Sequence, residues 1–175
     1  QLENFDKDTQ RLLKTRELEK KKADALAYQD DTLAEEAKQR GNDFFRAKDW
    51  PKAIEAFEEA VKRAPKNAAI RNNLSAALCK IMDFSGAKRQ IEVALELDPK
   101  YVKAYARRGD IDFMGKDLHK SMDSYKKGLA VDPENAACLE GLRKVQMQIN
   151  YGRSSMSEEE KKQQAAQAMS DPEIQ

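Results

Sequence analysis

Five polar side chains in this sequence have the chemistry to bind an anion: Lys38, Asn42, Asn73, Lys103 and Arg107. Lys offers a compact charge with three rotatable donors, Arg a planar fork of donors, and Asn a neutral donor. The first two, and likewise the last two, are four residues apart, so each pair would lie side by side on a helix. Any one basic residue among 32 Lys and Arg would mean little. Together, the five would suit a ligand with two carboxylates.

The other reactive residues form no catalytic or metal-binding set. His119 is the only histidine, and the pattern places it in a turn without an evident Cys or Asp partner. Cys79 and Cys138 lack the close spacing of a zinc site. No Gly-rich phosphate loop is present. We therefore expect a binding protein that is not an enzyme and that uses no cofactor or metal.

Composition narrows the environment and the partners. A net charge of +1 supplies no excess of bases to neutralise phosphates, so we expect no nucleic-acid partner. No apolar run approaches the roughly 20 residues of a membrane span, and no signal peptide is evident. The widely separated cysteines suit a reducing compartment. These features predict a cytoplasmic protein with no membrane partner.

One pattern recurs three times, at a spacing of 34 residues. Four kinds of residue fall in register: small residues at Gly41, Ser75 and Gly109; small residues at Ala53, Ala87 and Ser121; large residues at Phe57, Ile91 and Tyr125; and prolines at Pro65, Pro99 and Pro133. Glycine inside a helix costs up to about 1 kcal/mol relative to Ala, so a closely packed large residue is the expected compensation. Proline ends the second helix of each pair. The pattern resembles the tetratricopeptide (TPR) helix-turn-helix repeat and predicts an all-α TPR solenoid.

The predicted repeats span 34–67, 68–101 and 102–135. Their paired helices are expected at 33–47 and 51–63, 68–81 and 85–97, and 102–115 and 119–131. A capping box at Thr32-Leu33-Ala34-Glu35 would start the first repeat. A solenoid end needs a cap, and a helix at 136–149 would supply it with an apolar face of Leu139, Leu142, Val145 and Ile149. The repeat domain is then 32–150.

Two segments flank this domain. Residues 1–31 are dense in charge and predict a mostly exposed helix over 1–28, broken at 29–31. Residues 151–175 begin as a Gly/Ser linker, and a second capping box at Ser157-Glu158-Glu159-Glu160 would start a short helix. Since the chain opens on Gln1 rather than Met, we expect a segment of a longer protein.

The first helix of each TPR repeat lines the concave groove. At about 100° per residue, the inner positions are Glu35, Lys38, Gln39 and Asn42; Ala69, Asn72, Asn73 and Ala76; and Lys103, Ala106, Arg107 and Asp110. Three cations and several carboxamides would thus face one groove. We expect Phe45, Asn72 and Ala76 to form a secondary part of it.

The five anion-binding residues resemble, without substitution, the carboxylate clamp of co-chaperone TPR domains. The segments that carry the resemblance are Lys38-Gln39-Arg40-Gly41-Asn42, Asn73-Leu74-Ser75-Ala76-Ala77 and Lys103-Ala104-Tyr105-Ala106-Arg107. The resemblance implies that a C-terminal Asp places its two carboxylates on the Lys and Asn residues, while Arg107 binds the peptide upstream. The implied ligand is the Glu-Glu-Val-Asp terminus of the cytosolic 70- and 90-kDa heat-shock chaperones.

The flanks resemble one family in particular. Residues 27–36 are similar to the linker ahead of the last TPR module in the heat-shock organising (Hop, or stress-inducible) co-chaperone family. Residues 168–175 are similar to the start of its Asp-Pro-rich helical domain, here truncated. Residues 1–28 would then be the final helix of the preceding module. The resemblance implies an adaptor that binds mainly heat-shock protein 70, while heat-shock protein 90 binds elsewhere in the full-length protein, and that helps client transfer between them.

Two other functions remain open. A TPR scaffold could bind an internal helix or self-associate through Phe45, Phe113 and Met114, and would be indifferent to a free C-terminus. Alternatively, the clamp could be the interaction arm of an immunophilin- or phosphatase-type protein.

Overall fold

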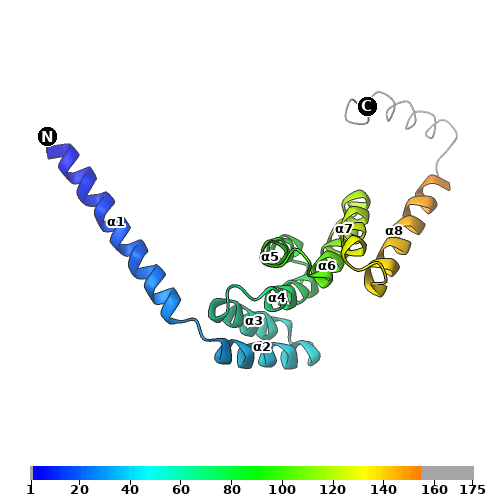
Figure 1. The fold of residues 1–175 in the computed structure, drawn as a ribbon, viewed down its shortest axis with the longest axis horizontal. Coiled ribbons are helices and arrows are strands. Elements are labelled where there is room, and N and C mark those ends of the chain that lie inside the picture. The colour runs from blue at the N-terminus through cyan, green and yellow to red at the C-terminus, as the bar shows by residue number, and fades with distance from the viewer. Residues whose placement is uncertain (1, 155–175) are drawn as a thin grey trace. The chain divides into compact units, whose positions relative to one another are not determined.

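The computed structural model describes residues 2–154, and this part of the chain forms eight α-helices and no strand (Figure 1). The chain divides into two compact units, Gln1–Pro99 and Lys100–Gln175. No helix among the described residues is long and apolar enough to cross a bilayer. The predicted helix start at 157–160 and the Asp-Pro segment at 168–175 lie outside the described residues.

The first unit contains α1 (Leu2–Ala27), α2 (Asp31–Arg46), α3 (Trp50–Arg63), α4 (Ala68–Lys80) and α5 (Phe84–Leu97). In this unit α2 packs against α3, α3 against α4, and α4 against α5 (Figure 1). The observed bounds of these four helices agree with the predicted ones to within two residues. The helix-turn-helix repeat is therefore confirmed in this unit.

A size match holds the two helices of the first repeat together. Phe57 of α3 is fully buried, and a Cβ atom added to Gly41 of α2 would lie 2.6 Å from its ring. Only glycine lets the ring approach this closely, and the burial of Phe57 outweighs the helix-propensity cost of Gly41. The predicted pairing of a small residue with a large one is confirmed.

The turns inside the three repeats share one construction. Lys48, Met82 and Lys116 adopt positive φ angles of 61°, 64° and 63°, and each is followed by an aspartate that caps the next helix. The side chains of Asp49, Asp83 and Asp117 each accept a hydrogen bond from the backbone N–H three residues on. These aspartates are 34 residues apart, a register that the sequence analysis overlooked.

The start of α2 differs from the prediction. Asp30, not Thr32, is the N-cap, and its Oδ1 accepts a hydrogen bond from the Leu33 N–H at 2.9 Å. Asp is at least as good an N-cap as Thr, and Asp30 comes first after the break that ends α1. The predicted capping box at 32–35 is therefore wrong.

Helix α1 is exposed wherever the structure describes its side chains, as predicted. Its end meets the rest of the first unit through two contacts at Arg63. The Asp30 N–H donates to the Arg63 carbonyl at 3.1 Å, and the Arg63 guanidinium lies 4.3 Å from the centre of the Tyr28 ring.

The second unit contains α6 (Val102–Met114), α7 (Leu118–Val131) and α8 (Ala136–Ser154), and α8 packs against both other helices. Its core includes Tyr125, Cys138 and Val145. The predicted capping helix is thus confirmed, with two corrections: it continues to Ser154, through the start of the predicted Gly/Ser linker at 151, and Leu139 is 48% exposed. Cys138 takes its place in the core because the buried stripe of α8 runs through 138, 141, 145 and 149, about 100° away from Leu139.

Candidate anion-binding site

In the first unit, the structure brings two predicted site residues together from different helices. The Asn73 amide on α4 donates to Oδ1 of Asn42 on α2 at 3.3 Å, and both side chains are half-buried. Lys38 lies one helical turn before Asn42 on the same face of α2. This unit therefore presents two carboxamides and a lysine on adjoining helices.

Lys38 already has a carboxylate partner. Its Nζ lies 2.6 Å from Oε2 of Glu35, one turn earlier on α2. The Lys38 side chain is 24% exposed and that of Glu35 is 62% exposed. Both residues were predicted on the inner face, and their separation of three residues is the sequence signal for this pairing.

In the second unit, Lys103 and Arg107 lie four residues apart on α6. Lys103 is exposed and makes no ion pair with any residue that the structure describes. Arg107 is half-buried, and its Nε is buried without a hydrogen-bond partner within residues 2–154. A buried donor without an acceptor is costly, but Nε of Arg108 is in the same state, so this feature alone does not single out Arg107 as a ligand-binding residue.

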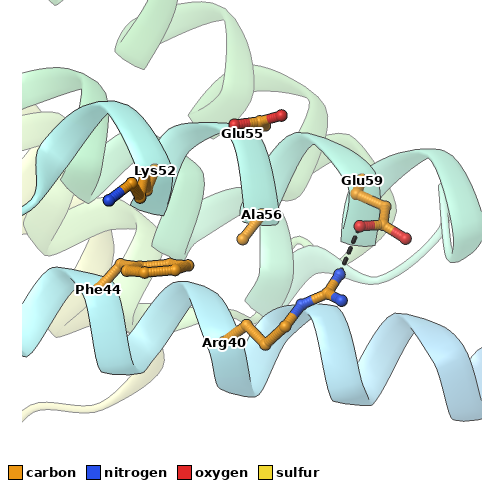
Figure 2. Close-up of a pocket in the computed structure, with 6 residues that line it drawn as sticks. All are labelled: Arg40, Phe44, Lys52, Glu55, Ala56 and Glu59. Atoms are coloured by element: carbon orange, nitrogen blue, oxygen red, sulfur yellow. Dashed lines mark hydrogen bonds and ion pairs between the residues drawn. The ribbon is translucent and has the colours of Figure 1, made fainter.

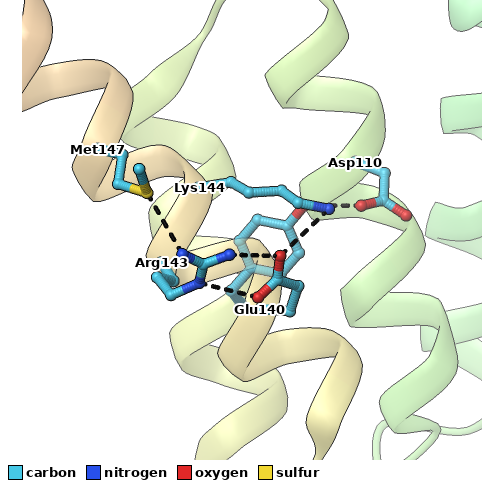
Figure 3. Close-up of polar contacts among 6 residues, drawn as sticks. Asp110, Glu140, Arg143, Lys144 and Met147 are labelled. Atoms are coloured by element: carbon cyan, nitrogen blue, oxygen red, sulfur yellow. Dashed lines mark hydrogen bonds and ion pairs between the residues drawn. The ribbon is translucent and has the colours of Figure 1, made fainter.

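Asp110, another predicted inner residue, is held by the core of the second unit (Figure 3). The Tyr125 hydroxyl donates to its Oδ1 at 2.7 Å. Burial of Tyr125, reinforced by this hydrogen bond, raises the pKa of the phenol. Asp110 therefore has a structural role.

Helix α8 adds charged residues that pair among themselves (Figure 3). Arg143 donates twice to Glu140, at 2.9 Å each, and Nζ of Lys144 lies 3.6 Å from the same carboxylate. The hydrogen bonds from Arg143 are the main cause that lowers the pKa of Glu140. Both cations of this cluster therefore share one carboxylate, and the three side chains keep a net charge of +1.

The predicted secondary groove is only partly open. Phe45 is half-buried with its ring edge-on to Trp50, 5.1 Å between centroids, and Ala76 is half-buried. Asn72 is a correction, because it is only 6% exposed and its Oδ1 has no partner in the described part of the chain. The equivalent Ala106 is also buried, within the cluster of Tyr125, Cys138 and Val145. In these two repeats, the side chains at positions 72 and 106 are therefore buried between helices and do not line a groove.

A separate depression of about 360 Å³ lies on the other side of α2, lined by Arg40, Phe44, Lys52, Glu55, Ala56 and Glu59 (Figure 2). Arg40 is about 200° around the helix from Lys38. Its guanidinium pairs with Glu59, and Nζ of Lys52 lies 5.7 Å from the centre of the Phe44 ring. This depression is therefore distinct from the surface with Lys38 and Asn42.

Metal binding has no support in the described residues. Within 2–154, no three His, Cys, Asp or Glu side chains are placed to hold a metal ion.

Comparisons with known proteins identify the family. A tetratricopeptide repeat model matches residues 44–108. The Hsp70-Hsp90 organizing protein 3 of Arabidopsis thaliana is 37% identical over 174 residues, which cover 99% of this chain and 31% of that protein. The chain thus spans about a third of this relative.

Two solved structures are similar in fold and sequence. The TPR2AB-domain:pHSP90-complex of yeast Sti1 has a TM-score of 0.71 and 34% identity, over 78% of this chain and 53% of the other. The TPR2B-domain:pHsp70-complex of yeast Sti1 has a TM-score of 0.63 and 31% identity, over 67% of this chain and 98% of the other. The chain therefore belongs to the Hsp70-Hsp90 organizing protein family, of which it carries a tetratricopeptide module.

Proposed function

We propose that this chain is a co-chaperone adaptor module that binds the C-terminal Glu-Glu-Val-Asp tail of heat-shock protein 70. Heat-shock protein 90 would bind in the full-length protein, and the adaptor would help clients pass between the two chaperones in the cytoplasm. The module acts by binding alone, without catalysis. The observation that carries the proposal is the contact between Asn42 and Asn73, which supports a donor set assembled from two repeats beside Lys38.

Each residue has a role in this proposal. Lys38, Asn42, Asn73 and Lys103 hold the two carboxylates of the terminal Asp, and Arg107 bonds the peptide upstream. Removing one side chain that makes a charge-assisted hydrogen bond should cost on the order of 1.5–3 kcal/mol of binding free energy. Ordering a flexible tail opposes binding. We therefore expect a micromolar dissociation constant, which corresponds to a binding free energy of about −8 kcal/mol. Binding should weaken with salt.

Calorimetric titration tests the proposal directly. The ligand is a peptide ending in Glu-Glu-Val-Asp, prepared once with a free carboxylate and once amidated. Binding of the free acid alone is the expected result. Tails with the upstream sequences of heat-shock proteins 70 and 90 then measure the preference between them. Equal binding of acid and amide would reject the clamp and favour a scaffold that binds an internal segment.

Single substitutions test the residues. We expect Asn73→Ala and Lys103→Ala each to weaken free-acid binding at least about tenfold, because each removes a charge-assisted hydrogen bond. The melting temperature of Lys103→Ala should stay nearly unchanged because that side chain is exposed, whereas Asn73→Ala should lower it by only a few degrees because it loses the hydrogen bond to Asn42. Lys126→Ala is the control for charge, since Lys126 is an exposed lysine on α7 of the same unit as Lys103. A comparable loss of binding in the control would reject this assignment.

A further inference from the structure

We propose that Glu35 is an internal competitor for the ligand: its carboxylate occupies Lys38 until a peptide carboxylate replaces it, and so sets the affinity of the site. This inference rests on the proposed function and concerns the same site.

The geometry supports direct competition. Oε2 of Glu35 lies 2.6 Å from Nζ of Lys38, which is hydrogen-bonding distance for a charged pair. Lys38 is 24% exposed, so little of its side chain remains open for a second carboxylate. Two carboxylates held at one ammonium would also repel each other. Glu35 is 62% exposed and can turn into water when a ligand arrives.

The repeat register points the same way. Glu35, Ala69 and Lys103 are successive copies of one repeat position, 34 residues apart. The position thus carries an acid in the first repeat and a proposed clamp lysine in the third. Packing does not require the acid, because Glu35 is exposed. An acid here lowers the affinity for an anionic tail, and so keeps binding reversible.

Helix stabilisation alone is the competing explanation, because a Glu three residues before a Lys supports a helix by itself. The chain offers a matched control. Asp43 and Arg46 form a second pair with the same spacing on α2, and both side chains are exposed. Asp43 is about 140° around the helix from Lys38. Asp43→Asn removes the same charge from the same helix without touching Lys38.

The experiment titrates the wild type, Glu35→Gln and Asp43→Asn with the free-acid peptide ending in Glu-Glu-Val-Asp. Release of an exposed ion pair predicts about two- to fivefold tighter binding for Glu35→Gln. We expect less than about 1.5-fold change for Asp43→Asn, because its pair does not involve Lys38. The gain should vanish when Glu35→Gln is combined with Lys38→Ala and compared with Lys38→Ala alone.

The outcomes separate this inference from the proposed function. If the wild type binds the free acid and not the amide, but Glu35→Gln binds equally or more weakly, Glu35 is no competitor and the clamp stands. An equal gain in Asp43→Asn would reduce the effect to general electrostatics and also overturn the inference. If the wild type does not distinguish acid from amide, the clamp itself fails, and the role of Glu35 fails with it.

Discussion

Asn42 and Asn73 lie on different helices of the first unit, yet the amide of one donates to the other. Together with the pairing of Lys38 and Glu35, this contact orders the proposed site residues of that unit before any ligand arrives. A ligand would therefore exchange existing interactions for new ones. Such an exchange costs less conformational entropy than ordering free side chains would.

Close packing at Gly109 gives a first prediction. A Cβ atom there would lie 2.5 Å from the Tyr125 ring. We expect Gly109→Ala to lower the free energy of unfolding by about 1–3 kcal/mol, because overpacking exceeds the gain in helix propensity. Urea unfolding measures the change.

Gly115→Ala is the matched control. Its φ is negative, and the nearest atoms to an added Cβ lie 3.5 Å away. It should be neutral or slightly stabilising. Equal stability of the two variants would contradict the steric argument.

Glu59 should make the stability depend on pH. Its hydrogen bond to Arg63 is the main cause that lowers its pKa below the ordinary value of 4.5, with further attraction from Arg40. A lowered folded-state pKa means that the ionised form stabilises the fold above about pH 4.5, and that this contribution is lost as the pH falls through the folded-state pKa. We expect Glu59→Gln to lose less stability than the wild type between about pH 7 and about pH 3.

Denaturant unfolding at several pH values tests this expectation. Glu58→Gln, at the exposed neighbouring position, is the control and should keep the acid sensitivity of the wild type. Identical pH dependence of the wild type and Glu59→Gln would reject the role of Glu59.

Sequence reasoning named the residues of the proposed site but not the contacts that each of them makes. The spacing of Lys38 and Asn42, and of Lys103 and Arg107, was sufficient to place each pair on one helix. Which partner Lys38 takes depends on side-chain rotamers, and the burial of Asn72 depends on how neighbouring helices pack. Helical periodicity fixes neither the partner of Lys38 nor the burial of Asn72. It specifies the direction in which a side chain leaves the helix but not which neighbouring residues it meets.

At the level of elements, each turn inside a repeat is built by a residue with positive φ and an aspartate cap. A residue with a Cβ atom is strained in the left-handed region. The cap after it compensates by satisfying one of the free N–H groups of the next helix. The two features together define where the second helix begins.

Removing one cap should destabilise the fold measurably. Asp83 accepts from the Gly86 N–H at 2.8 Å. We expect Asp83→Ala to lower the free energy of unfolding by about 1 kcal/mol. Asp83→Asn should retain most of the stability that the cap supplies, because Asn keeps the accepting oxygen. Thermal unfolding followed by circular dichroism compares the two. A loss of the same size in Asp83→Asn would mean that the charge, rather than the cap, is responsible.

The helices themselves were predictable because their apolar periodicity and terminal prolines repeat. The residues at which the helices begin were less predictable. The capping box at 32–35 has the right residue types, yet Asp30 caps first. Leu139 has the right spacing for the core, yet Cys138 is buried in its place. Competing caps and adjacent apolar residues leave such choices to tertiary packing.

For the whole molecule, burial is distributed unevenly along the chain. All described side chains of α1 are exposed, whereas α8 contributes Cys138 and Val145 to the core of the second unit. The two end helices therefore differ in what they contribute to stability.

Deleting each end helix tests this difference. A chain that begins at Ala27 keeps Tyr28 and the Asp30 cap, and its melting temperature should change by less than about 2 °C. Its helical circular dichroism signal should fall in proportion to the helical residues that α1 contributes. A chain that ends at Asn135 exposes the core around Tyr125 and should melt far lower. Similar melting temperatures for the two truncated chains would contradict this distribution.

The size matches between Gly41 and Phe57 and between Gly109 and Tyr125 also bear on how such repeats can be recombined. A glycine and its ring lie on the two helices of one repeat, so neither helix can be exchanged alone for that of a relative with a different pair of volumes. A chimera joined in the turn at Lys48 or Lys116 would set a side chain against a ring or leave a void. Joining at repeat boundaries keeps each pair intact, but the third repeat must be exchanged together with α8, because a Cβ atom added to Gly141 would also clash with the Tyr125 ring.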